Sequence, residues 1–566
     1  MKKFYVAVFV VTLLFLGSGI AGAEVTAKNG MVSAAHELAS KAGVEIMQKG
    51  GNAIDAAVAT SLALSVVEPT FTGAGGGGFS TIRFAKTGEV VFVDYREMAP
   101  ASATKDMYAS EQAKKENWST VGGKSVGVPG FIKGLFYMLE KYGTMSFAQV
   151  AEPAIRYAEE GYIVQPFQVE LATRYFLVFN QFHEPDQIPF LKDGLPFPAG
   201  ETFKIPELAK TYRLLAEKGP SVLYEGEIGE AMVAQVNRTG GNMTMDDLKN
   251  YEIKVRTPIE GNYRGYKIYS SPPPSSGGTH VVQILNIMEN FPVDKWKVDS
   301  PERLHVLAEA VRMVFADRQK YMGDADFIKV PLKGLADKRY AKKLAEKISP
   351  TVVRDEIQPD DPWVFNESSL VLYPSAGTEG IGFNTSHFSV VDAEGNIVST
   401  TNTHNGPADF VPVYGIVLNN EMDDFAKEPT SVNAPEPRKR PLSSMSPTVV
   451  LDANGKPFIT VGSAGSWRII TAVSQIIMNI IDYNMTMDQA IQHPRIFTFA
   501  TDGKAAPLLI ENTMNPETVE ALKKMGHNLD VRDKSDYFGT SQGILFKDGL
   551  MHGGADSRRL GVPVGY

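Results

Sequence analysis

The chain has 566 residues, with 65 Asp and Glu against 56 Lys and Arg, nine His and no Cys. Its 43% hydrophobic and 21% charged residues are typical of a globular protein with a large apolar core, which excludes disorder as the main state. A formal charge of −9 argues against a dedicated nucleic-acid binder, and the lack of Cys excludes disulfides, thiolate metal sites and cysteine nucleophiles.

The N-terminus has the three parts of a secretory signal peptide. A basic start precedes an apolar run over residues 4–16, and the small residues Ala21 and Ala23 follow it. The run is shorter than the roughly 20 residues that span a bilayer, so a membrane anchor is the weaker alternative. We predict a signal peptide over residues 1–23, cleavage after Ala23, and export to a bacterial periplasm or the exterior.

The apolar pattern predicts helices and strands mixed along the whole chain. In the first part of the chain, it predicts two helices within residues 34–65, a β-hairpin within 79–95 and a mostly helical section over about 145–347. A loop or linker is predicted over residues 349–384. After it, the pattern predicts strand pairs at 385–391 with 397–403 and at 447–451 with 457–461, and helices over 468–482 and from 515 to 526.

Residues 73–78 satisfy G-x-G-x-x-G, the phosphate-binding pattern of dinucleotide sites. That pattern needs a strand before it and a helix after it, whereas here the strand-like residues 79–83 follow. We therefore predict no nicotinamide or flavin cofactor, and expect this backbone to lie close to a ligand or a neighbouring strand. The scattered His residues lack metal-ligand spacing, so no metal site is expected.

Hydroxyl and small polar residues are concentrated in the last third of the chain. Each segment alone is consistent with strand threonines and turn chemistry. Taken in order, together with residues 50–59, 94–100 and 272–278, they form a specific set. The segments are residues 384–392, 400–405, 418–425, 440–448 and 462–466.

This ordered set resembles the γ-glutamyltransferases, or glutathione hydrolases, of the N-terminal-nucleophile superfamily. The resemblance covers residues 28–566. It implies an α+β fold in which two sheets are packed between two helical layers, a four-layer αββα sandwich. It also implies cleavage of γ-glutamyl amides such as glutathione without a cofactor, with transfer of the glutamyl group to water, amino acids or peptides.

Members of this family are made as a precursor that cuts itself immediately before a Thr. The matching bond here joins Asn384 to Thr385. The resemblance implies a large subunit, residues 24–384, and a small subunit, residues 385–566, which stay associated as one intertwined domain. Cleavage frees the α-amino group of Thr385, whose ordinary pKa of about 7.7–8.0 suits a general base for its own hydroxyl.

The resemblance assigns a role to each residue of the expected site. Thr385 is the nucleophile that forms a γ-glutamyl ester, Thr403 orients it, and the backbone N–H groups of Gly465 and Ser466 form the oxyanion hole. The donor's α-carboxylate and α-ammonium bind elsewhere in the site, and a bidentate guanidinium suits the carboxylate. The donor-binding residues are Arg96, Ser443 and Ser444 for the carboxylate, and Asn405, Glu421 and Asp424 for the ammonium.

The sequence departs from the family pattern at two places. Ser466 and Trp467 stand where many members have Gly and Ser, which leaves the balance of hydrolysis to transfer open. The connection between Asp424 and Ser443 is too short for the Tyr-bearing lid loop of several bacterial members, so we predict an open donor site. The alternative is that another loop, carrying Phe410 or Tyr414, covers the site.

Three other functions are compatible with parts of this pattern. A glutaryl-type cephalosporin acylase and a poly-γ-glutamate depolymerase would use the same scaffold. Glu421 and Asp424 favour an amino-bearing donor, since a glutaryl group has no ammonium to bind. A non-processing periplasmic γ-glutamyl peptide-binding protein would need neither Thr385 nor Thr403. The expected partners are thus small-molecule donors and acceptors, with no nucleic acid and no membrane span after signal removal.

Overall fold

The structure is a computed structural model, which describes residues 24–176, 187–366, 384–409 and 411–566. The predicted signal peptide, most of the predicted linker and Phe410 lie outside the described residues. Across the part of the chain that is described, no helix is long and apolar enough to cross a membrane.

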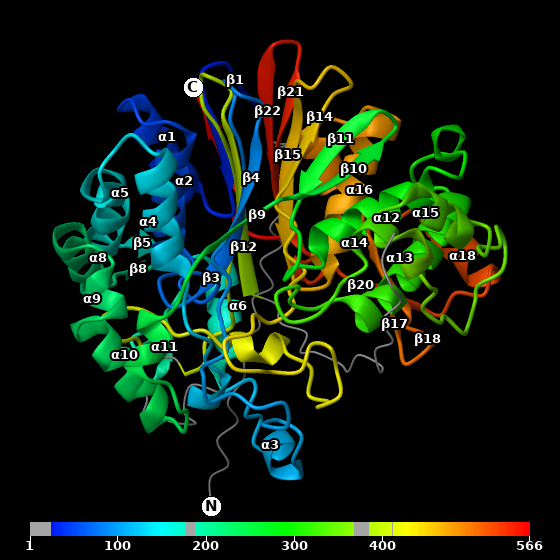
Figure 1. Cartoon of the computed structure of the whole chain (residues 1–566). Helices are drawn as coiled ribbons and strands as arrows, with labels where there is room; N and C mark the ends of the chain where they lie inside the picture. The colour runs from blue at the N-terminus through cyan, green and yellow to red at the C-terminus, as the bar shows by residue number, and fades with distance from the viewer. Residues whose placement is uncertain (1–23, 177–186, 367–383, 410) are drawn as a thin grey trace, which may run out of the picture.

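Two antiparallel seven-stranded sheets lie face to face at the centre of the molecule (Figure 1). The first sheet has the order β23 (Val562–Gly565), β2 (Met31–Ala34), β12 (Asn384–Val391), β13 (Ile397–Asn405), β3 (Gly77–Arg83), β4 (Val90–Asp94), β9 (Lys254–Arg256). The second has the order β1 (Val25–Ala27), β22 (Leu550–Ala555), β21 (Thr540–Lys547), β15 (Pro457–Ala464), β14 (Thr448–Leu451), β11 (Tyr266–Ser270), β10 (Ile259–Tyr263).

A helical layer covers the outer face of each sheet, as Figure 1 shows on its left and right sides. One apolar core joins the first sheet to α1 (Glu37–Gln48), α2 (Ala53–Val67), α4 (Phe131–Tyr142) and α5 (Phe147–Glu160). The other joins the second sheet to α12 (Gly277–Met288), α13 (Pro301–Tyr321) and α16 (Arg468–Tyr483). This arrangement confirms the predicted αββα sandwich.

Shorter elements surround these layers. The helices are α3 (Glu111–Lys115), α6 (Pro166–Arg174), α8 (Pro206–Lys218), α9 (Ser221–Tyr224), α10 (Glu227–Arg238), α11 (Met245–Lys249), α14 (Leu332–Leu335), α15 (Lys338–Ala345), α17 (Met487–Gln492) and α18 (Pro516–Lys524). The strands are β5 (Tyr162–Ile163), β6 (Leu191–Lys192), β7 (Leu195–Pro196), β8 (Thr202–Phe203), β16 (Ile496–Phe497), β17 (Ala500–Thr501), β18 (Lys504–Ala505), β19 (Leu508–Glu511) and β20 (Leu529–Arg532).

Helix α2 shows how one sequence motif builds this fold. The side chain of Asn52 accepts hydrogen bonds from the N–H groups of Ile54 and Asp55, and Asp55 accepts one from the Asn52 N–H, which completes a capping box. Asp55 also accepts hydrogen bonds from Thr144, at the start of the turn into α5. Every residue of α2 is buried, and its alanines and serines allow close packing against the first sheet.

The prediction of a mostly helical section over residues 145–347 is confirmed, although the section also contains strands that were not predicted. Helices do dominate it, but β9, β10 and β11 also lie there and complete one edge of each sheet. These strands are short and half-exposed, and two of them lie at a sheet edge, so they lack the long apolar alternation of a central strand. The predicted hairpin and the two predicted strand pairs in the last third are confirmed.

Candidate active site

A pocket of about 330 Å³ brings together the residues that the sequence assigned to one site. Of the predicted residues, all except Asn384 and Gly465 line it, and each of those two precedes a lining residue in the chain. The predicted residues that line the pocket are Arg96, Thr385, Thr403, Asn405, Glu421, Asp424, Ser443, Ser444 and Ser466.

Paired strands hold the hydroxyl end of this pocket. Strand β12 begins beside the end of β13, where Asn384 is paired with Asn405 and the register shifts before Ser386. This irregularity falls on Thr385, so its side chain can leave the regular alternation of the sheet. Because β12 starts where β13 ends, Thr385 lies close to Thr403.

The hydroxyl of Thr385 is directed at the carbonyl group of Asn384. Its Oγ1 donates to the Asn384 carbonyl oxygen over 2.6 Å and lies 3.2 Å from Oγ1 of Thr403. The Thr403 hydroxyl donates to the same carbonyl oxygen over 2.8 Å, and itself accepts from the Asn405 N–H over 2.7 Å. Two hydroxyl donors therefore polarise the carbonyl that precedes Thr385.

A glycine lets the neighbouring backbone approach this end of the pocket. A Cβ on Gly76 would lie only 2.1 Å from the carbonyl oxygen of Thr403. A side chain here would push β13 away and move Thr403. This confirms the interpretation of residues 73–78 as backbone packed against a neighbouring strand.

The opposite end of the pocket is charged. Arg96 follows β4, and its guanidinium is buried between acidic side chains. Its Nη1 forms an ion pair with Glu421, and its Nη2 donates to Asp424 over 2.5 Å. Oε2 of Glu97 lies 3.8 Å from Nη1. Three carboxylates therefore face one guanidinium.

This crowding shifts the protonation of the cluster. Burial raises the pKa of Glu97 from 4.5 to about 7, although Arg96 opposes the shift. Burial likewise raises the pKa of Glu421. Burial lowers the pKa of Arg96, but the ion pairs with Glu421 and Asp424 outweigh that effect and raise it. The cluster therefore contains more carboxyl oxygens than Arg96 pairs with, and Arg96 itself stays positively charged.

Loops carry the remaining polar groups of the pocket. The acidic turn Glu421–Asp424 is held by Asn419, whose side-chain oxygen accepts from the N–H of Glu421 over 2.9 Å. The Ser443 N–H donates to the Pro274 carbonyl over 3.0 Å, and Ser276 N–H donates to the Ser443 carbonyl over 2.8 Å. The motif at residues 272–278 thus positions the two serines.

Gly465 and Ser466 form the turn between β15 and α16. Both have left-handed backbones, with φ of 123° and 55°, and a Cβ on Gly465 would lie 2.8 Å from Gly539. A left-handed serine is strained, typically by about 1 kcal/mol or more. Among the described residues, neither N–H group of this pair has a hydrogen-bond acceptor. Such donors at a helix start suit a developing oxyanion.

The geometry agrees with a comparison against protein families. The γ-glutamyltranspeptidase family model matches residues 39–566. The chain belongs to this family. It is 39% identical over 547 residues to the glutathione hydrolase proenzyme of Bacillus subtilis, and the match covers 95% of this chain and 92% of that protein.

Two solved structures extend the family assignment. A cephalosporin acylase from Bacillus halodurans matches with a TM-score of 0.84 and 28% identity, covering 96% of this chain and 97% of that one. A γ-glutamyltranspeptidase from Helicobacter pylori matches with a TM-score of 0.55 and 42% identity, covering 57% of this chain and 93% of that one. The scaffold is therefore shared by acylases and transpeptidases.

Within this γ-glutamyltranspeptidase family member, Trp467 does not project freely beside the turn at Gly465 and Ser466. It is buried, packing against Phe315 at 5.9 Å and Phe499 at 5.3 Å between ring centroids. The guanidinium of Arg318 lies 5.5 Å from its ring and donates to Ser444 Oγ over 3.1 Å. Arg318 thus lines the pocket as a second cation, and it was not predicted because it lies in helix α13, outside the motifs that carry the family resemblance.

A second set of residues missed by the sequence holds the strand at Thr385. Arg559 donates to the Thr385 carbonyl oxygen over 2.7 Å and stacks on Phe71, with 3.9 Å to the ring centroid. The Ser386 hydroxyl donates to Glu68, which lies 3.8 Å from Arg559. Arg559 is 174 positions from Thr385 and Glu68 is 318 positions from Ser386 in sequence, so no local pattern could have identified them.

The connection after Asp424 folds back on itself and does not cover the pocket. Ala426 N–H donates to the Asn433 carbonyl over 3.0 Å, and the Asn433 side chain bonds the carbonyl of Asp424 and the N–H of Leu442. Of the residues between Asp424 and Ser443, only Leu442 lines the pocket. Tyr414 does not line it, and Phe410 lies outside the described residues.

Proposed function

We propose that the chain is a self-processing γ-glutamyltransferase and hydrolase in which Thr385 is the nucleophile. The observation that carries the proposal is the Thr385 hydroxyl, placed against the Asn384 carbonyl in a pocket whose other end holds Arg96 among carboxylates. Family membership supports an enzyme that acts on γ-glutamyl amides. The geometry supports the two reactions described below.

The first reaction is processing. Thr385 Oγ1 attacks the Asn384 carbonyl carbon, the C–N bond breaks, and the nitrogen takes up the proton released by the hydroxyl and leaves as the α-amine of Thr385. The resulting ester joins Asn384 to the Thr385 hydroxyl, and water hydrolyses it to a carboxylate and a free hydroxyl. Thr403 assists because its hydroxyl already donates to the oxygen that becomes negative. The products are residues 24–384 and 385–566.

The second reaction is turnover. The free amine of Thr385 has an ordinary pKa near neutrality, so it accepts the hydroxyl proton as Oγ1 attacks a γ-glutamyl amide. The N–H groups of Gly465 and Ser466 are placed to stabilise the oxyanion. The amine product leaves with the proton, and water or an acceptor amine then resolves the γ-glutamyl ester. Neither step requires a cofactor.

The charged end recognises the α-amino-acid group of the donor. Three carboxyl groups around one guanidinium offer more acceptor oxygens than the guanidinium pairs with, and the donor's ammonium can donate to them. The donor's carboxylate is bound by Arg96 and the hydroxyls of Ser443 and Ser444. Arg318, which reaches Ser444, adds positive charge on the same side. A donor that carries both an ammonium and a carboxylate fits these acidic and basic groups better than a donor that carries a carboxylate alone.

This match separates the proposal from the acylase alternative. The Bacillus halodurans structure is a cephalosporin acylase, so the scaffold permits that function. A glutaryl group would place a carboxylate near Glu421 and Asp424 without an ammonium to offset their charge. The binding-protein alternative leaves the Thr385 and Thr403 geometry without a purpose.

One experiment tests the function. Purified protein is run on a denaturing gel and assayed with γ-glutamyl-p-nitroanilide and glutaryl-p-nitroanilide. We expect two fragments, the smaller beginning Thr-Ser-His-Phe, and at least a hundredfold preference for the γ-glutamyl anilide. An intact, fully active chain would contradict Thr385 as an N-terminal nucleophile, and a preference for the glutaryl anilide would favour the acylase.

The same sample tests the predicted export. We propose that the mature large subunit begins at Glu24, in a periplasm or outside the cell. N-terminal sequencing of the large fragment from an exported preparation would show Glu-Val-Thr. A fragment that begins at Met1 would contradict the predicted cleavage.

A further inference from the structure

A second pocket lies on the face of β12 opposite to the active site. Thr385 lines the active pocket, whereas the Ser386 hydroxyl bonds to Glu68, which lines the second pocket. We name it the aromatic pocket because its walls include Phe71, Phe167, Phe190, Phe197 and Phe203.

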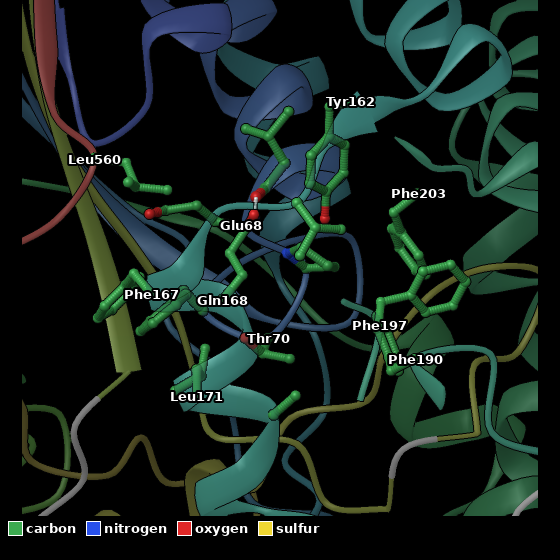
Figure 2. Close-up of a pocket in the computed structure, with 15 residues that line it drawn as sticks. Glu68, Thr70, Tyr162, Phe167, Gln168, Leu171, Phe190, Phe197, Phe203 and Leu560 are labelled. Carbon is green, nitrogen blue, oxygen red and sulfur yellow. Dashed lines mark hydrogen bonds between the residues drawn. The ribbon is translucent and has the colours of Figure 1, made fainter. Parts of the chain in front are cut away.

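The aromatic pocket has the size and lining of a small-molecule site. The space open to the centre of a water molecule is about 60 Å³, several times the roughly 10–15 Å³ that one buried water needs. Figure 2 shows Phe190, Phe197 and Phe203 grouped on one side, with Phe167 and Leu560 on the other. Such walls favour a flat apolar ring, because rings pack against rings with additional attraction.

One polar group in the lining lacks a partner. Glu68 is only 3% exposed, and its Oε2 accepts from Ser386. Its Oε1 has no hydrogen-bond partner among the described residues. A buried oxygen without a donor is unfavourable, typically by about 1–3 kcal/mol, so a ligand that donates to it gains affinity.

The charge around Glu68 limits the ligand to a neutral molecule. Arg559 lies 3.8 Å from Glu68 and offsets its negative charge. Arg559 is itself fixed over the rings of Phe71 and Phe167, at 3.9 and 5.8 Å. A cationic ligand would add an unbalanced charge to an apolar site, which is costly. A hydroxyl supplies the missing donor without a charge.

We propose that the aromatic pocket binds a small neutral aromatic alcohol, whose ring packs among the phenylalanines and whose hydroxyl donates to Oε1 of Glu68. This site is separate from the donor pocket, and its occupancy does not depend on γ-glutamyl chemistry.

The first test compares two probes of similar size on the full processed protein. Phenol and toluene are titrated and followed by ligand-detected NMR. We expect phenol to bind with a Kd of about 1 mM, as for other small fragments, and toluene to bind at least about fivefold more weakly, the effect of one net hydrogen bond. Equal affinities, or no binding, would overturn the proposal.

Variants then locate the bound phenol. Ala172 lines the pocket on α6, so Ala172→Phe fills it, whereas Thr173→Phe, exposed on the same helix, is the matched control. Thr70→Phe fills the pocket from a different segment, in case Ala172→Phe does not fold. We expect both fillers to abolish phenol binding and Thr173→Phe to retain it. Phenol binding that persists in both Ala172→Phe and Thr70→Phe, or that L-glutamate displaces, would overturn the proposal.

Discussion

The two ends of the active pocket are built differently. The hydroxyl end contains Thr385 and Thr403 on adjacent central strands, and its groups are small and neutral. The charged end contains Arg96 and its carboxylates, which lie on loops and a short turn. Strand pairing fixes the hydroxyls of Thr385 and Thr403 to within a hydrogen-bond length, whereas loops supply the charged groups. The following experiments separate reaction from recognition.

The largest effect is expected from Thr385→Ala. Loss of the hydroxyl removes the group that attacks both Asn384 and the donor, so the variant should remain a single chain with turnover at least about a thousandfold lower. A denaturing gel and an anilide assay measure both. Thr385→Ser is the matched control, because it keeps the hydroxyl and should still be processed. A processed, active Thr385→Ala protein would show that the hydroxyl end is not the reacting end.

Arg96→Lys tests the charged end alone. A lysine keeps the charge but loses the fork that contacts Glu421 and Asp424 together. We expect kcat/KM for glutathione to fall at least tenfold, the order of one charge-assisted hydrogen bond, while processing continues. The matched control is Arg83→Lys, which makes the same change at a buried arginine on β3 outside the pocket. Unchanged kinetics would remove Arg96 from substrate recognition.

Thr403→Val makes a smaller change at the hydroxyl end. Valine keeps the shape of the side chain but cannot donate to the Asn384 carbonyl or accept from Asn405. We expect processing to slow about tenfold, the cost of losing these hydrogen bonds, with KM for the donor little changed. Time courses of precursor cleavage give the rate. If only KM for the donor rises, then Thr403 acts in donor binding, and the assignment of reaction to the hydroxyl end and recognition to the charged end is wrong.

Donor length tests whether the pocket is open. The connection from Asp424 to Ser443 folds away from it, so bulky donors should enter. We expect kcat/KM for a γ-glutamyl oligomer to lie within about tenfold of that for glutathione, with hydrolysis competing well with transfer to glycylglycine. A loss of a hundredfold or more on the oligomer would mean that another segment closes the site.

The smallest effect concerns pH. Burial raises the pKa of Glu97 to about 7, so it gains its negative charge between pH 6 and 8. Inhibition by L-glutamate, whose ammonium this charge attracts, should strengthen about threefold over that range. Glu97→Gln should flatten the dependence. An unchanged profile in that variant would assign the titration to another group.

The same pKa shift has the opposite consequence for stability. Glu97 releases its proton near pH 4.5 in the unfolded chain but near 7 in the folded one. The folded state therefore binds the extra proton between these values, and the free energy of unfolding falls as the pH rises from 5 to 7. Glu97→Gln should lose less stability than the parent over this interval, as measured by denaturant unfolding.

Local patterns were sufficient for the strand pairs around Asn384 and for helix α16, because their apolar periodicity is strong. The short strands β9 to β11, which lie at or next to a sheet edge, were missed, since half-exposed strands have little alternation to detect. The family resemblance located the residues of the active pocket, from Arg96 to Ser466, whereas composition and spacing alone left them as strand and turn residues.

The sequence by itself determined the fold class, the family and most of the residues that gather in one pocket, because those follow from ordered motifs along one chain. Only the tertiary structure decided that Arg96 is already paired with acids, that Trp467 is buried, that Arg559 and Glu68 hold the strand at Thr385, and that an aromatic pocket lies behind it. Each of these depends on contacts between distant segments, whose distances and burial are set by packing the two sheets together.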